Sequence, residues 1–170
     1  MCRVEDGNVR YAPLCIYKFH LVAPRKLLEA QMFNQQYHEY EEIKNVPERL
    51  KWHRYHRGLM QKEVAEAIGV TRRQYQQLEL GTIDYYPREL VNKLAELYQI
   101  KVEELLDEYN WFLYRGQGSL IKKFRESLGL GRKQFAQLIN VNLGVLRNWE
   151  EESNRINKES WERCFKDMIL

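Results

Sequence analysis

Apolar residues recur at helical spacing over most of the 170-residue chain, which predicts a mainly α-helical protein. The pattern is most regular between residues 47 and 106, where it predicts five short helices. Residues that commonly end or break helices separate these segments: Gly58, Gly69, Gly81 and Pro87. We therefore expect one helical domain over residues 47–106.

The first 46 residues are expected to form an extension of this domain. Apolar residues alternate with others between residues 14 and 22, which predicts a short strand. From Pro24 to about Lys44 the spacing becomes helical. The apolar stripe of that helix consists of Ala30, Phe33, Tyr37, Tyr40 and Ile43. Because residues 1–46 are amphipathic and aromatic without being strongly basic, we interpret them as an element for packing or for binding a partner.

Residues 107–119 are interpreted as a connector to a second helical region, residues 120–170. The connector contains two glycines, and Ser119 is suited to cap the helix that follows. Its aromatic half, residues 109–114, is too apolar for a free linker, and we expect it to pack. Near the end of the chain an apolar helical stripe could either dock on the core or form a self-association surface: Trp161, Cys164, Phe165, Met168 and Ile169.

An internal repeat relates the two helical regions. A shift of 71 positions superposes residues 54–79 on residues 125–150 without a gap, and eight of the 26 positions are identical. Chance would give roughly 6% identity for average composition. The identical pairs are Arg54 and Arg125, Gly58 and Gly129, Leu59 and Leu130, Lys62 and Lys133, Ala65 and Ala136, Ile68 and Ile139, Val70 and Val141, and Glu79 and Glu150. The repeat predicts two copies of one helical unit.

The first copy has the pattern of two helices joined by a sharp turn. Val64, Ala65 and Ile68 form the inner stripe of one helix, Gly69 permits the turn, and Thr71 caps the next helix. The outward face of that second helix carries side chains that can pair with base edges in the major groove of DNA. These side chains are Arg72, Arg73, Gln76 and Gln77.

At these residues the sequence resembles the Cro and phage-repressor type of helix-turn-helix protein, the XRE family, over about 60 residues. The resemblance implies a lambda-repressor-like helical bundle whose recognition helix enters the major groove of double-stranded DNA. It implies base contacts by Arg72, Arg73 and Gln77, with Gln76 as a further candidate. It also implies phosphate contacts by Gln61, Lys62 and Thr82, and a structural ion pair between Arg54 and Glu79.

The second copy keeps the core pattern but changes the recognition face. Its ending, residues 146–150, is similar to antitoxin-type members of the same superfamily. Leu143 and Gly144 replace the two arginines of the first copy, so that DNA contact and a packing or protein-binding role both remain open. The structural ion pair would join Arg125 to Glu150. Possible DNA contacts are Arg132, Asn142, Arg147 and Asn148.

Composition narrows the functional classes. The net charge of +3 is too small to indicate nucleic-acid binding by itself. No apolar run is long enough for a membrane span, and the polar start is unlike a signal peptide, so we expect a cytoplasmic protein. The three cysteines lack disulfide or zinc spacing, and no catalytic motif is present. We therefore expect no metal, no cofactor and no enzymatic activity.

Two functional hypotheses remain. The first is a sequence-specific transcriptional repressor of bacterial or phage origin, which binds two half-sites either as a homodimer or through its tandem copies. The second is an antitoxin or a phage-encoded inhibitor that represses its own promoter. Such a protein would bind a toxin or a host enzyme through residues 1–46 or through the second copy.

Overall fold

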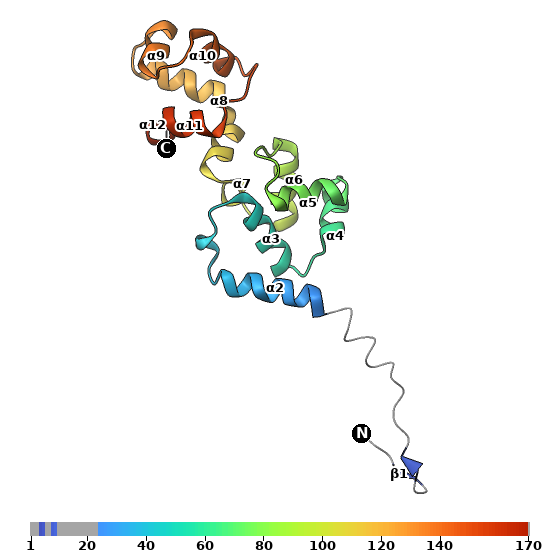
Figure 1. Ribbon diagram of the computed structural model, residues 1–170. Coiled ribbons are helices and arrows are strands. Elements are labelled where there is room, and N and C mark those ends of the chain that lie inside the picture. The colour runs from blue at the N-terminus through green and yellow to red at the C-terminus, as the bar shows by residue number, and fades with distance from the viewer. Residues whose placement is uncertain (1–3, 6–7, 10–23, 170) are drawn as a thin grey trace. The chain divides into compact units, whose positions relative to one another are not determined.

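The computed structural model describes residues 4–5, 8–9 and 24–169, and most of these residues are helical (Figure 1). The prediction of a mainly α-helical protein is confirmed. Two short strands, β1 (Val4–Glu5) and β2 (Asn8–Val9), pair in antiparallel orientation. The strand expected over residues 14–22 lies outside the described residues. The chain divides into two compact units, Met1–Ile43 and Lys44–Leu170.

The helix expected from Pro24 to Lys44 is shorter than predicted. Helix α2 spans Pro24–Gln36 and is followed by the 3-10 turn η1 (Tyr40–Glu42). A continuous helix would have placed three glutamates in its last turns, where the helix dipole disfavours negative charge. Instead, the carboxylate of Glu42 accepts a hydrogen bond of 3.0 Å from the backbone N–H of His38.

Residues 44–106 form five helices, as the apolar pattern predicts. They are α3 (Val46–His56), α4 (Gln61–Ile68), α5 (Arg72–Leu80), α6 (Arg88–Tyr98) and α7 (Val102–Leu105). Their inward faces share one apolar core, in which the largest fully buried side chains are Leu50, Ile68, Tyr75, Leu94, Tyr98 and Leu105.

The turn between α4 and α5 is set by its own residues. Gly69 ends α4 in the left-handed conformation, with φ of 75°, and the N–H of Val70 returns to the carbonyl of Ala65 at 2.9 Å. The Thr71 hydroxyl then accepts the N–H of Gln74 at 3.2 Å, and the Gln74 side chain accepts the N–H of Thr71 at 2.8 Å. This capping box starts α5 after a turn of three residues.

The segment interpreted as a connector is helical, which corrects the sequence-based expectation. Helix α8 spans Glu108–Ser127 and begins at Asp107, whose carboxylate accepts the N–H of Asn110 at 2.8 Å. Gly116 (φ 95°, ψ 93°) is not helical, and two helices within this range meet there at a kink instead of being separated by a loop. The Ser119 hydroxyl donates to the carbonyl of Gly116 at 2.9 Å, whereas an N-cap side chain accepts a backbone N–H, so Ser119 does not act as the expected cap. The expected packing of the aromatic half is present, because Tyr109 and Phe112 are buried.

The rest of the chain consists of α9 (Arg132–Leu138), α10 (Leu143–Glu150), α11 (Lys158–Cys164) and α12 (Lys166–Ile169). A second apolar core lies among these helices and α8. Trp161, Cys164 and Phe165 are buried in it, so that this part of the terminal stripe docks on the core. The stripe belongs to two short helices because the backbone departs from helical geometry at Phe165.

The side chain of Gln117 fastens the loop after α10 to α8. Its Nε2 donates to the carbonyl of Asn154 at 2.7 Å and to that of Trp149 at 3.2 Å. Its Oε1 accepts the N–H of Ile156 at 3.0 Å. Because the Gln117 side chain is buried, these hydrogen bonds also satisfy its own amide group. They hold the end of α10 in place.

His53 lies buried in the first core and should make stability depend on pH. Its ring stacks on Tyr98 with centroids 5.4 Å apart, and Arg57 Nη1 lies 3.2 Å from its Nδ1. Burial, aided by the nearby positive charges of Arg57, His56 and Arg49, lowers the pKa of His53 to about 4. An unfolded histidine titrates near 6.5. The unfolded chain therefore binds more protons between these two pH values.

We expect the free energy of unfolding to fall by about 3 kcal/mol as the pH drops from 7.5 to 4, on account of His53 alone. Urea unfolding of the wild type and of His53→Gln across this range measures the difference. The variant should have a shallower pH dependence, whereas His38→Gln, which changes an exposed histidine, should keep the wild-type slope. Parallel curves for His53→Gln and the wild type would contradict the assignment.

Candidate nucleic-acid interface

Helix α5 presents a polar face to solvent because its apolar side is buried. Tyr75, Leu78 and Glu79 point into the protein. On the other side Arg72, Arg73 and Gln76 are exposed and Gln77 is half-buried. None of these four side chains forms a hydrogen bond or an ion pair with another described residue. Their guanidinium and amide groups are therefore available to a ligand.

A buried ion pair fixes α5 against α3. Arg54 Nε lies 2.5 Å from Glu79 Oε1 and Arg54 Nη2 lies 3.0 Å from Glu79 Oε2, in a bidentate arrangement. The two side chains are only 8% and 2% exposed. Burial by itself would lower the pKa of Arg54, but the hydrogen bond and the charge of Glu79 outweigh it and raise the pKa above its usual value. Arg54 therefore stays charged at neutral pH.

Two further contacts orient α5. Gln61, at the start of α4, donates from Nε2 to Glu79 Oε2 at 2.8 Å, so the three helices α3, α4 and α5 meet at one carboxylate. One turn before Glu79, the hydroxyl of Tyr75 lies 2.8 Å from the hydroxyl of Tyr98. Burial raises the pKa of Tyr98 to about 12, so this hydroxyl pair stays neutral. The polar face of α5 is thus carried by a helix whose buried side is held by polar contacts at Tyr75 and Glu79.

The candidate phosphate contacts of the first copy lie around α4 and the end of α5. Gln61 is half-buried and bound to Glu79, as described above. Lys62 is exposed and lies 3.6 Å from Glu66, an equally exposed partner one turn away. The hydroxyl of Thr82 donates to the carbonyl of Gln77 at 3.2 Å and so closes the end of α5. Of these three side chains, only that of Lys62 is engaged solely in a weak surface contact.

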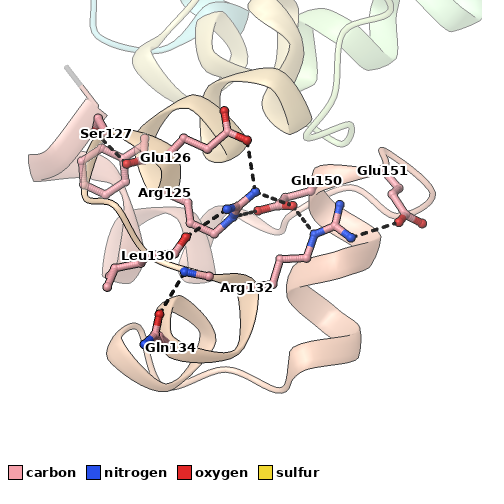
Figure 2. A network of polar contacts seen from close by, with 10 residues as sticks. Arg125, Glu126, Ser127, Leu130, Arg132, Gln134, Glu150 and Glu151 are labelled. Carbon is pink, nitrogen blue, oxygen red and sulfur yellow. Dashed lines mark hydrogen bonds and ion pairs between the residues drawn. The ribbon is translucent and has the colours of Figure 1, made fainter.

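The polar contacts of residues 125–150 repeat those of residues 54–79, and Figure 2 shows them. Arg125 Nε donates to Glu150 Oε1 at 2.6 Å, and Arg125 Nη1 donates to the carbonyl of Leu130 at 3.0 Å. In the first copy Arg54 Nη1 donates to the carbonyl of Leu59 at 3.3 Å. Arg132 stands at the position of Gln61 and likewise reaches the carboxylate, with Nε 2.6 Å from Glu150 Oε2 (Figure 2).

The Glu150 carboxylate is held by the guanidinium groups of Arg125 and Arg132. Burial would raise the pKa of Glu150, but hydrogen bonds from Arg125 and Arg132 outweigh it and hold the pKa below its usual value. The hydrogen bond to Glu150 also raises the pKa of Arg132. The sequence resemblance implied only Arg125 as the partner of Glu150. The repeat aligns Arg132 with Gln61, but the contact of Gln61 with Glu79 was not predicted either, so no sequence signal indicated this third member.

The other candidate contacts of the second copy lie on α10. Asn142 caps the helix, and its Oδ1 accepts the N–H of Gly144 at 2.8 Å. Arg147 is exposed and donates from Nε to Glu151 at 2.9 Å, whereas Asn148 is half-buried. Two aliphatic side chains, Leu143 and Val145, are 45% and 39% exposed on the same helix. The surface of α10 is therefore less polar than that of α5.

A comparison with known protein families agrees with the geometry of the first copy. Residues 48–110 match a family model described as a helix-turn-helix domain. This segment is therefore similar to helix-turn-helix domains of the XRE type. The match covers less than half of the chain. No curated protein and no solved structure matches it.

The family match marks a DNA-binding, transcription-regulator-like protein. Domains of this type are typical of regulators that are not enzymes. Within residues 4–5, 8–9 and 24–169, no helix is long and apolar enough to cross a membrane. The same residues contain no cluster of three or more histidine, cysteine or carboxylate side chains suited to a metal ion.

Proposed function

We propose that the protein binds double-stranded DNA in a sequence-specific manner, with α5 as the recognition helix in the major groove. The observation that carries this proposal is the exposed, unpaired face formed by Arg72, Arg73, Gln76 and Gln77 on a helix that buried contacts hold rigidly. Arginine pairs in bidentate fashion with guanine, and glutamine pairs with adenine. Phosphate contacts by Gln61, Lys62 and Thr82 would fix the register of α5 on the duplex.

We further propose that residues 120–170 are a second, diverged copy of this domain. Support comes from the backbone: the left-handed positions Gly58, Gly69 and Gly81 recur 71 residues later as Gly129, Asn140 and Glu152. The turn bond recurs as well, since the N–H of Val141 reaches the carbonyl of Ala136 at 2.9 Å. Most residues other than glycine adopt positive φ only with strain. The left-handed conformation of Glu152 would thus have been retained from a sequence with glycine at this position.

As its biological role we propose repression of transcription in a bacterium or a phage. The protein would cover an operator of two half-sites as a homodimer, with the two recognition helices about one turn of DNA apart. A tandem arrangement of the two copies on one operator is the alternative. The domain boundaries would then be residues 1–46, 47–106 and 120–170, with the first half of α8 between the two copies.

A second candidate function is that of an antitoxin or a phage-encoded inhibitor which also represses its own promoter. The observation that favours it is the exposed aliphatic surface of the second copy, where Leu138, Leu143 and Val145 are 63%, 45% and 39% exposed. Exposed apolar side chains at this position suit a protein partner such as a toxin or a host enzyme better than they suit DNA. Helix α2 adds Leu28 and Met32, which are also exposed.

The proposed function is tested by the double variant Arg72→Ala/Arg73→Ala. Each bidentate base contact contributes roughly 1–3 kcal/mol, so we expect at least about a 30-fold loss of affinity for a site selected from random DNA. Fluorescence anisotropy with that duplex measures the loss. Lys101→Ala/Lys158→Ala removes two positive charges outside α5 and should bind nearly as the wild type does. Undiminished binding by the α5 variant would overturn the assignment of the recognition helix.

A further inference from the structure

One carboxylate in the second copy contacts two of its exposed arginines, Arg132 and Arg147. Glu151 follows α10 directly, and its Oε1 accepts a hydrogen bond of 2.9 Å from Arg147 Nε. The same oxygen lies 3.7 Å from Arg132 Nη1, a contact that Figure 2 shows. Arg132 and Arg147 are also the two charged side chains among the possible DNA contacts of this copy. The two positive charges that could contact a phosphate therefore face the Glu151 carboxylate of the same chain.

The first copy has none of these three charges. The residues 71 positions earlier are Gln61, Gln76 and Leu80, and all are uncharged. Two arginines and one glutamate thus distinguish the second copy from the first at positions that the structure brings together. The carboxylate is placed where the two guanidinium groups converge.

The convergence of Arg132 and Arg147 describes a site for a single anion. Arg132 is oriented by its second contact, from Nε to the buried Glu150 at 2.6 Å, which leaves Nη1 directed toward Glu151. Two guanidinium groups on one oxygen are the arrangement that also binds a phosphate oxygen. The side chains of Arg132, Arg147 and Glu151 are 41%, 65% and 43% exposed, so that a ligand from solution can reach them.

We propose that Arg132 and Arg147 form a binding site for a DNA backbone phosphate, and that Glu151 competes with the phosphate for this site. Glu151 thereby lowers the affinity of the second copy for DNA. This inference rests on the proposed function in that it takes residues 120–170 to be a DNA-binding unit. Exposed ion pairs are weak, so the carboxylate weakens the site without closing it.

The test uses the full-length chain with Glu151→Gln, which removes the charge and keeps the size of the side chain. The matched control is Glu159→Gln, which removes the same charge from an exposed position on α11. Binding to a random-sequence duplex of about 30 base pairs is measured by anisotropy over a series of salt concentrations. We expect Glu151→Gln to bind about threefold to tenfold more tightly than Glu159→Gln, with a salt dependence that is steeper by about one phosphate contact.

Equal affinities and equal salt dependences for these two variants would overturn the proposal. The double variant Glu151→Gln/Arg147→Gln provides a second test, because it removes one arm of the site. It should lose the gain in affinity, and a gain that persists would show that the effect does not act through Arg147. All variants are first compared by thermal unfolding, where wild-type melting is expected because the changed side chains are exposed.

The same comparison in the Arg72→Ala/Arg73→Ala background separates this proposal from the proposed function. If α5 reads DNA, the background variant binds the selected site more weakly, yet the difference between Glu151→Gln and Glu159→Gln should remain. If α5 does not read DNA, the background change has no effect on affinity for the selected site. The comparison of Glu151→Gln with its control Glu159→Gln then still decides whether Glu151 lowers the affinity of the second copy.

Discussion

Replacement of Glu79 by alanine is expected to lower the free energy of unfolding by about 3–5 kcal/mol, the usual cost of removing one partner of a buried ion pair. The reason is the guanidinium of Arg54, which is buried and would lose both of its contacts to the carboxylate. Gln61 would lose its acceptor as well. Urea unfolding at pH 7 measures the loss.

Two controls sharpen this prediction. Glu66→Ala removes an exposed carboxylate whose ion pair with Lys62 is 3.6 Å long, and it should change stability by less than about 1 kcal/mol. The double variant Arg54→Met/Glu79→Leu replaces both charges by apolar groups and should recover much of the stability lost in Glu79→Ala. If Glu79→Ala unfolds like the wild type, the carboxylate does not fix α5, and the rigid recognition helix loses its basis.

Much of the first domain could be predicted from the sequence because its signals are local. Gly69 and Gly81 end helices in the left-handed conformation, and Thr71 caps α5 through contacts within three residues. The outward face of α5 follows from the burial of Tyr75 and Leu78 at helical spacing. The contact between Arg54 and Glu79 spans 25 residues, so local patterns could not reveal it, and only the resemblance to a known family implied it.

Two predictions were wrong, that of a connector over residues 107–119 and that of a helix continuing to Lys44, because glycine and charge patterns are ambiguous. Glycines favour loops as a rule, but Gly116 and Gly118 lie within α8, where Gly116 produces a kink. The sequence also gave no reason to link Gln117 with the loop after α10, because their hydrogen bonds span 32 to 39 residues. The close approach of this loop explains why a glycine is needed at position 118.

The two copies differ in what surrounds the same ion pair. In the first copy the glutamate meets one arginine and an uncharged amide, Gln61, and the adjacent recognition face is left unpaired. In the second copy Arg132 replaces the amide, and Glu151 balances the added charge at the surface. If residues 120–170 are a second copy, as proposed, the two copies would keep the same buried support and differ in the polar groups at the surface that attract phosphate.

Replacement of Gly118 by alanine is expected to destabilise the protein by about 3 kcal/mol, the upper end of the usual cost of overpacking, although alanine favours helices more than glycine does. The added Cβ would lie 2.4 Å from the carbonyl oxygen of Glu150 and 2.8 Å from Cγ of Glu152. The carbonyl oxygen of Glu150 belongs to the backbone and cannot move by a side-chain rotation. Gln117 holds the same segment by three hydrogen bonds, so the clash can be relieved only if these hydrogen bonds are displaced.

Urea unfolding of Gly118→Ala measures this cost, with Gly131→Ala as the matched control. At position 131 the added Cβ has no neighbour closer than 3.5 Å and φ is −71°, so a change of no more than about 1 kcal/mol is expected. If Gly118→Ala were as stable as the wild type, the loop after α10 could not lie on α8. The position of Glu151 beside Arg132 would then lose its support, because that loop starts at the residue following α10.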